Sequence, residues 1–158
     1  ETTYQQPEII TPEINGQWIY APIQSSGKTY EPYYAITDQT SKQWPLLNGI
    51  LIHGEDGMIR DADGYIAAAL GSYFGPIGSR WIFLLDNGKQ LKIIKADQKQ
   101  DIHTANGNGI NGIDSYDIIE FIVNPNIMPK WSNGYVYGGN FNNIEEYQGT
   151  VVAWQRID

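Results

Sequence analysis

Apolar residues recur in short runs along the chain, and the clearest pair of runs lies at residues 81–94. The segments 81–86 (WIFLLD) and 89–94 (KQLKII) are rich in β-forming residues and flank Asn87-Gly88. This dipeptide favours a type I′ turn, whose twist matches that of two antiparallel strands. The pattern therefore predicts a β-hairpin with a type I′ turn.

Two further segments are predicted to be strands. DIIEFIV (117–123) lies between a Gly/Asn-rich loop and Asn124-Pro125, and TVVAWQRI (150–157) is the last apolar run. YIAAALG (65–71) is ambiguous, because its alanines favour a helix whereas its short length between glycines is compatible with a strand. The run NGNG (106–109) is expected to be a mobile, solvent-facing loop.

Residues 1–30 differ from the rest of the chain. They contain three prolines, few charges and no sustained hydrophobic period, which predicts an extended N-terminal arm that ends in a loop at residues 25–27. Residues 31–158 carry the strand patterns and no internal repeat, so they are expected to form one mainly β domain. A chain of 158 residues is long enough for one self-sufficient core.

Composition narrows the classes of function. The net charge is −8 and the 10 basic residues are scattered, which argues against a nucleic-acid partner. The absence of cysteine excludes a thiolate nucleophile, a Cys-ligated zinc and a disulfide framework. Eleven Tyr and five Trp suit stacking on sugars as well as packing in a β core.

The sequence contains no targeting or membrane-spanning pattern. No run approaches the ~20 apolar residues of a membrane span, and no signal-peptide pattern is visible. Because the first residue is Glu1 rather than Met, we expect a processed form or an excised piece of a longer chain.

Candidate chemistry lies in ADQKQDIHT (96–104), where ionisable residues occupy every second position. In a strand, Asp97, Lys99, Asp101 and His103 would share one face, and such a face is unlikely to be core. The two aspartates would lie about 13 Å apart along a flat strand, farther than the ~5 Å or ~6.5–9.5 Å of paired glycosidase carboxylates. They do not form an obvious glycosidase pair by themselves.

Glu120 is a second candidate, because its apolar neighbours predict burial and a buried carboxylate needs a partner. Two interpretations stay open. Glu120 either lies across the sheet from Asp97 and helps to keep it protonated, or it accepts hydrogen bonds from Lys99, His103, Arg80 or backbone amides. Three interpretations stay open for His103: a base, a residue that orients Asp101, or a structural histidine.

Metal and nucleotide sites find little support. Asp97, Asp101 and His103 are ligand types, but a strand spaces them too widely to reach one ion. RDADG (60–64) lacks the first and twelfth ligands of a calcium loop. GNG (107–109) lacks the third glycine and the helix of a dinucleotide site, and no GxSxG motif is present. The sequence predicts neither a metal nor a cofactor.

Three segments taken together resemble a known module: ALGSYFGPIGSRWIFLLDNGK (69–89), IIKADQKQDIHT (93–104) and DIIEFIVN (117–124). They are similar to a double-psi β-barrel module of Firmicutes and phage cell-wall proteins. That module is related to three-aspartate muralytic domains, the membrane-bound lytic transglycosylase A group, expansins and family 45 endoglucanases. The resemblance covers residues 33–157 and implies a six-stranded double-psi β-barrel with a groove. It also favours a strand at 65–71.

The resemblance implies a lytic transglycosylase of peptidoglycan with a single Asp acid/base. Asp97 falls on the second aspartate of the three-aspartate pattern and Glu120 on the third, whereas the first has no counterpart near Gly71. The alternatives are a non-catalytic, expansin-like polysaccharide-binding module and a phage tail structural component. Each predicts an extracellular, cell-wall or virion location, with peptidoglycan or virion proteins as partners. The expected catalytic residues are Asp97, Glu120 and Asp101, and the expected substrate-binding residues are Lys99, His103, Thr104, Tyr73, Tyr65 and Trp44.

Overall fold

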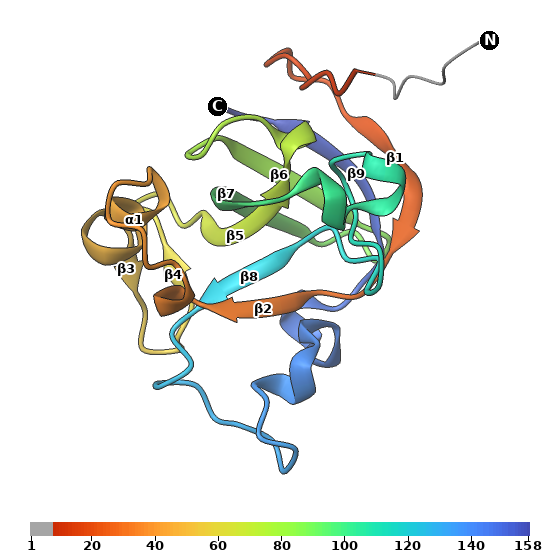
Figure 1. Cartoon of the computed structure of the whole chain (residues 1–158). Coiled ribbons are helices and arrows are strands. Elements are labelled where there is room, and N and C mark those ends of the chain that lie inside the picture. Colours follow the sequence, from red (N-terminus) through yellow and green to blue (C-terminus); the bar gives the residue numbers. More distant parts are fainter. Residues whose placement is uncertain (1–7) are drawn as a thin grey trace, which may run out of the picture.

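The computed structural model describes residues 8–158, which form a mainly β structure built on one mixed sheet (Figure 1). The one α-helical turn among them, α1 (Gln43–Pro45), leads into a wider helical turn at residues 46–50. Over residues 8–158 no helix has the length and apolarity needed to cross a bilayer. The strands are β1 (Ile19–Ser25), β2 (Thr29–Pro32), β3 (Ile52–His53), β4 (Ile59–Arg60), β5 (Ile66–Gly71), β6 (Arg80–Leu85), β7 (Gln90–Lys99), β8 (Glu120–Val123) and β9 (Val151–Arg156).

The sheet contains nine strands in the order β1-β9-β6-β7-β5-β4-β3, and β8 pairs with both β5 and β2. The pairs β2/β8 and β5/β7 are parallel, whereas the other pairs are antiparallel. Where six strands were expected, the described residues supply nine. The pairing over residues 8–158 leaves β1, β2 and β3 at open edges, so the path does not close on itself.

β5 is buried on both faces, which explains why an alanine-rich segment forms a strand. Ala68 and Leu70 face the larger core cluster, and Ala67 and Ala69 face a smaller one. A strand between two cores needs an apolar residue at every position, and this burial outweighs the helix propensity of alanine. The strand that the resemblance favours at 65–71 is therefore confirmed. The larger core includes Phe74, Trp81, Phe83, Phe121 and Trp154, and the smaller includes Leu47, Ile59, Tyr65 and Ile122.

The predicted hairpin is confirmed as β6 and β7, but its turn is not type I′. The N–H of Gly88 donates to the carbonyl of Leu85 (3.0 Å), and the N–H of Leu85 donates to the carbonyl of Lys89 (2.9 Å). Gly88 has a φ of 87°, whereas Asn87 is not among the residues with positive φ, although a type I′ turn requires both. The loop therefore has three residues, 86–88, with the glycine in the left-handed position.

A bulge in β7 decides which side chains reach the groove described below. Lys95 pairs with Ala68 and Asp97 pairs with Ala69, so Ala96 is an extra residue. Asp97 consequently lies beside Ala69, on the face of the smaller core. β7 ends at Lys99, and residues 101–103 form a 3-10 turn. The prediction of one strand face that continues to Asp101 and His103 is therefore wrong.

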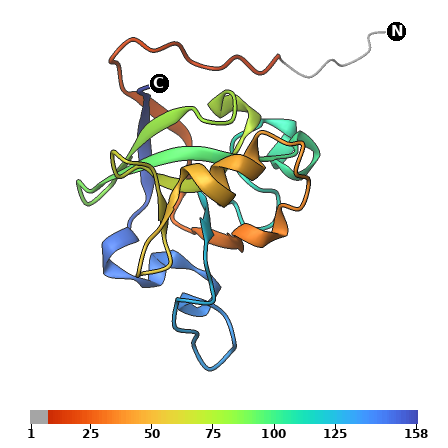
Figure 2. The same cartoon turned by 90° about the vertical axis from the view of Figure 1, so that its left-hand side faces the viewer.

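The sheet extends into the segment that was expected to be an arm. β1 pairs with β9, and β2 begins at Thr29, so the expected boundary at residue 30 falls inside a strand. Residues 8–18 contain no strand and reach the end of β9, where the Arg156 guanidinium donates to the carbonyl of Pro12 (3.0 Å). Figure 2 shows them at the same end of the molecule as the last residue. Residues 1–7 of the expected arm lie outside the described residues.

The remaining predictions concern β8, β9 and the Gly/Asn-rich loop. β9 confirms the predicted last strand, whereas β8 is shorter than predicted and begins at Glu120. The loop at 106–109 is not simply solvent-facing, because Gly109 is buried and its N–H donates to the hydroxyl of Thr104 (3.0 Å). A Cβ built on Gly71 would lie 1.9 Å from the carbonyl oxygen of Gly109. The loop is therefore packed tightly against the end of β5.

Candidate functional site

An open groove with a volume of about 380 Å³ lies on the sheet face that carries Ala69. Strands β2, β5, β7 and β8 supply part of its lining, and residues 112–117 supply another wall. The lining residues are Thr29, Glu31, Ala69, Asp97, Gln98, Lys99, Gln100, His103, Gly112, Ile113, Asp114, Ser115, Asp117 and Glu120.

Strand register brings three carboxyl groups to this groove. Ala69 on β5 pairs with Asp97 on one side and with Glu120 on the other, and Glu120 pairs in turn with Thr29 on β2. Glu31 lies two residues beyond Thr29 and hence on the same face of β2. The small side chain of Ala69 leaves space between Asp97 and Glu120. Glu120 thus lies across the sheet from Asp97, with one strand between them, as in one of the two interpretations left open for it.

Glu31 is the most perturbed acid of the groove. Burial, followed by the hydrogen bond and negative charge of Asp97, raises the pKa of Glu31 from 4.5 to about 9. Its Oε1 atom is buried and has no donor among the described residues. Two carboxyl groups can hydrogen-bond to each other only if one of them carries a proton. Burial and this contact thus favour the protonated form of Glu31 at neutral pH.

Asp97 accepts a hydrogen bond from a residue outside the sheet. The side-chain amide of Gln43, which begins α1, donates to Asp97 Oδ1 (3.2 Å). Glu31 thus joins Asp97 and Glu120 in the groove, as a third carboxyl group that the sequence did not single out.

Glu120 is also driven toward its neutral form. Burial raises its pKa, and the positive charge of Lys99 opposes the rise without cancelling it. Asp117 and Asp97 add smaller contributions that raise the pKa further. The groove thus contains two carboxyl groups, Glu31 and Glu120, for which burial favours protonation.

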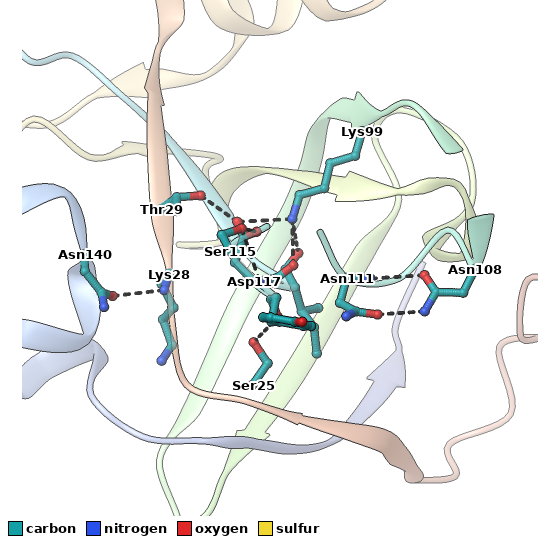
Figure 3. Close-up of polar contacts among 11 residues, drawn as sticks. Ser25, Lys28, Thr29, Lys99, Asn108, Asn111, Ser115, Asp117 and Asn140 are labelled. Carbon is teal, nitrogen blue, oxygen red and sulfur yellow. Dashed lines mark hydrogen bonds and ion pairs between the residues drawn. The ribbon is translucent and has the colours of Figure 1, made fainter. Parts of the chain in front are cut away.

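Lys99 lines the groove, and its ammonium group is bound to other residues of the protein (Figure 3). Its ammonium donates to the carbonyls of Asp117 (3.0 Å) and Ile118 (3.2 Å), and it lies 3.2 Å from the Asp117 carboxylate. The Asp117 carboxylate also accepts from the hydroxyl of Thr29 (2.5 Å) and from Ser115. Lys99 thereby ties β7 to the wall at 112–117, and a substrate that binds Lys99 would have to compete with these bonds.

Of the residues that follow β7, some line the groove and others form hydrogen bonds outside it. His103 lines the groove, whereas Asp101 lies outside the lining and accepts a hydrogen bond from the hydroxyl of Ser72 (2.5 Å). Thr104 is 1% exposed, and its hydroxyl donates to the carbonyl of Asp101 (2.6 Å). Asp101 does not join the catalytic set expected from the sequence, because the chain leaves the strand before it.

None of the three aromatic residues expected to stack on sugar lines the groove. Tyr65 is 7% exposed, and the Arg80 guanidinium lies 4.6 Å from the centre of its ring. Tyr73 packs in the larger core, where its hydroxyl accepts from the indole N–H of Trp154 (3.3 Å). Trp44 lies on α1, next to the Gln43 that contacts Asp97.

Sequence reasoning missed Glu31 and Gln43. Glu31 lies in TYEP, a four-residue strand that ends in proline and has too few residues to show an alternating pattern. The one local signal is an acid between aromatic residues, Tyr30 and Tyr33, and it does not distinguish a site from a strand edge. Gln43 reaches Asp97 from a turn more than fifty positions earlier in the chain.

Two further tests of the site concern metals and known proteins. Within residues 8–158, no group of three or more His, Asp or Glu side chains is arranged to hold a metal ion. No protein-family model and no curated protein matches the sequence.

Proposed function

We propose that this protein cleaves the glycan strands of peptidoglycan as a lytic transglycosylase, with Glu31 and Asp97 at the reacting bond. The observation that carries the proposal is the carboxyl pair in an open groove, in which burial and Asp97 raise the pKa of Glu31 to about 9. A carboxylic acid that stays protonated at neutral pH can act as a general acid, and a placed acid contributes about 10²–10⁴-fold to the rate.

The reaction needs one proton donor and no water. Glu31 donates its proton to the glycosidic oxygen as the bond between that oxygen and the anomeric carbon breaks. The 6-hydroxyl oxygen of the same N-acetylmuramic acid ring attacks the anomeric carbon, and its proton passes to the Glu31 carboxylate. The products are a free 4-hydroxyl and a 1,6-anhydro ring, and the acid is regenerated. Asp97 holds the Glu31 proton in place and stabilises positive charge that develops at the anomeric carbon.

The fold and location belong to the same proposal. We assign the sheet to the double-psi barrel class, and the two parallel pairs β2/β8 and β5/β7 within an otherwise antiparallel sheet support this assignment. A protein with this activity acts where peptidoglycan is exposed, at the cell wall or in a phage virion.

The test is mass spectrometry of soluble products released from purified peptidoglycan. We expect 1,6-anhydromuramic ends from the unsubstituted protein and at least a 100-fold loss in Glu31→Gln and Asp97→Asn, in line with the contribution of a general acid. Asp101→Asn is the matched control, because Asp101 lies outside the groove lining. Circular dichroism establishes that each variant folds.

The outcomes separate the proposal from its rivals. Release that survives Glu31→Gln but not Asp97→Asn would make Asp97 the acid and contradict the role given to Glu31. If the folded, unsubstituted protein retains peptidoglycan without cutting it, the polysaccharide-binding alternative takes the place of the enzyme. If it neither cuts nor retains peptidoglycan, a structural role in a phage tail becomes the better explanation.

A further inference from the structure

The strand-free segment between β8 and β9 differs in composition from the rest of the chain. Residues 124–144 contain no Asp or Glu and one basic residue, Lys130, although the whole chain has a net charge of −8. A segment that is rich in amides and aromatic rings and poor in charge is suited to neutral, hydroxyl-rich ligands rather than to ions. The asparagines are Asn124, Asn126, Asn133, Asn140, Asn142 and Asn143, and the aromatic residues are Trp131, Tyr135, Tyr137 and Phe141.

Core packing accounts for two of these aromatic residues but not for the other two. Phe141 is fully buried, and Tyr137 packs against the larger core. Trp131 is 47% exposed and Tyr135 is 58% exposed. Both lie in the part of the chain that projects from the sheet below β8 and β2 in Figure 1, a projection that is also clear in Figure 2.

The two exposed rings are carried by a small ordered hairpin at residues 130–136. Lys130 pairs with Val136, and the N–H of Trp131 donates to the carbonyl of Tyr135 (3.0 Å). The N–H of Gly134 donates to the carbonyl of Trp131 (2.8 Å) and closes the turn. The backbone that carries both rings is therefore fixed before any ligand arrives, which lowers the entropic cost of binding.

The indole of Trp131 also rests against the backbone of Gly138. A Cβ built on Gly138 would lie 2.7 Å from Cε3 and 2.9 Å from Cζ3 of Trp131, so the ring rests against a backbone that has no side chain there. Gly138 has a φ of 67°, which glycine adopts without strain. The indole is thus supported on one side while nearly half of the residue stays exposed.

Amide groups flank this aromatic pair. The Asn143 side-chain N–H donates to the carbonyl of Tyr137 (3.1 Å), and Asn133 Oδ1 accepts from the N–H of Tyr135 (3.0 Å). These bonds fix each amide through one atom. Its other polar atom, the oxygen of Asn143 and the nitrogen of Asn133, is of the type that bonds sugar hydroxyls.

We propose that the hairpin at 130–136 is a binding site for a neutral glycan chain, in which Trp131 and Tyr135 stack on pyranose rings and Asn133 and Asn143 bond hydroxyl groups. The site is separate from the catalytic groove, whose lining includes no residue between 124 and 144. Binding at this hairpin does not depend on the proposed reaction, so the site binds glycan whether or not the groove cuts it.

The test measures binding of the tetramer of β-1,4-linked N-acetylglucosamine by calorimetry, in an Asp97→Asn background that prevents turnover. Trp131→Ala and Tyr135→Ala should each weaken binding by about tenfold, the loss expected for one aromatic contact. Tyr20→Ala is the matched control, because Tyr20 is a 78% exposed tyrosine on β1. It should leave the affinity unchanged.

A second measurement keeps the proposal testable if Trp131→Ala fails to fold. In the intact protein, the NMR signal of the Trp131 indole N–H should shift on addition of the tetramer, whereas that of the fully buried Trp81 should not. An unmoved Trp131 signal, or equal affinity in the Tyr135→Ala and Tyr20→Ala proteins, overturns the proposal. If Glu31→Gln stops the release of peptidoglycan fragments but leaves binding of the tetramer unchanged, that result bears on the groove and not on the hairpin.

Discussion

Among single residues, Lys99 is expected to contribute to stability through a buried ion pair. It forms an ion pair with Asp117, and the two side chains are 9% and 5% exposed. Lys99→Met leaves the carboxylate of Asp117 buried without its cation, which costs about 3–5 kcal/mol of unfolding free energy. Denaturant titration followed by tryptophan fluorescence measures this loss.

Lys92→Met provides the matched control for that substitution. Lys92 is exposed on the same strand, β7, and has no acidic partner among the described ion pairs. Its ammonium lies 5.5 Å from the centre of the Tyr65 ring, and such a contact at an exposed site is worth about 0.5–1 kcal/mol. Its removal should therefore lower the free energy of unfolding by no more than about 1 kcal/mol. Equal losses for the two variants would mean that the pair with Asp117 contributes nothing beyond an ordinary surface lysine.

At the scale of elements, the contact between β5 and the loop at 104–117 determines one wall of the groove. A Cβ on Gly71 would overlap the carbonyl of Gly109, whose own φ is 70°. Gly71→Ala should therefore push the loop from the end of β5, and amide hydrogen exchange at residues 104–117 should become faster. The carboxyl pair on β2 and β7 should be less affected, because Asp97 is placed by its pair with Ala69, two residues before Gly71.

Gly49→Ala tests whether this effect is specific to the contact. A Cβ on Gly49 meets no atom within 4 Å, and its φ is not in the left-handed region. Exchange at 104–117 should be the same as in the unsubstituted protein. If Gly71→Ala also leaves those amides protected, the loop tolerates displacement and does not form a fixed wall.

The elements also show which parts of the fold are encoded locally. The hairpin β6/β7 and the strand β9 could be predicted, because each has an apolar run of sufficient length next to a turn signal. The turn type was predicted wrongly, because Asp86 joins the loop. The helix-or-strand ambiguity of 65–71 has no local solution, since it depends on the two cores that cover β5.

The candidate site was predictable in part for the same reason. Asp97 and Glu120 stand out in sequence as acids beside apolar runs, whereas the proximity of Glu31 depends on a parallel pair, β2/β8, between distant segments. The bulge at Ala96 sets the face on which Asp97 lies, and no alternation in the sequence reveals it. Positions that depend on such long-range register are the ones that local patterns miss.

At the scale of the whole molecule, several buried ionisable groups link stability to pH in opposite directions. Burial lowers the pKa of Lys28 and of Lys95 from 10.5 to about 8. Between those values the folded protein binds fewer protons than the unfolded chain, so this contribution to stability rises with pH. The contribution of Glu31 to stability falls as the pH rises, and it does so at lower pH. Near neutral pH its effect can therefore be measured without that of the two lysines.

Near neutral pH the stability of the protein should fall as the pH rises. The pKa of Glu31 is raised from 4.5 to about 9, so the folded protein keeps a proton that the unfolded chain releases. Its stabilising contribution is complete below the lower value and is lost as the pH rises toward the upper one. The raised pKa of Glu120 acts in the same direction. The slope from Glu31 alone is at most about 1.4 kcal/mol per pH unit.

Glu31→Gln should remove this dependence, because glutamine has the shape of the protonated acid and does not ionise. The measurement is the midpoint of thermal unfolding between about pH 5.5 and pH 7.5, where the Glu31 difference is nearly one proton. Glu55→Gln is the control, since Glu55 is an exposed acid. The midpoint should fall with pH in the unsubstituted protein and in Glu55→Gln, and less steeply in Glu31→Gln. Three parallel slopes would mean that Glu31 is already ionised in the folded protein, and the acid of the proposed reaction would have to be another residue.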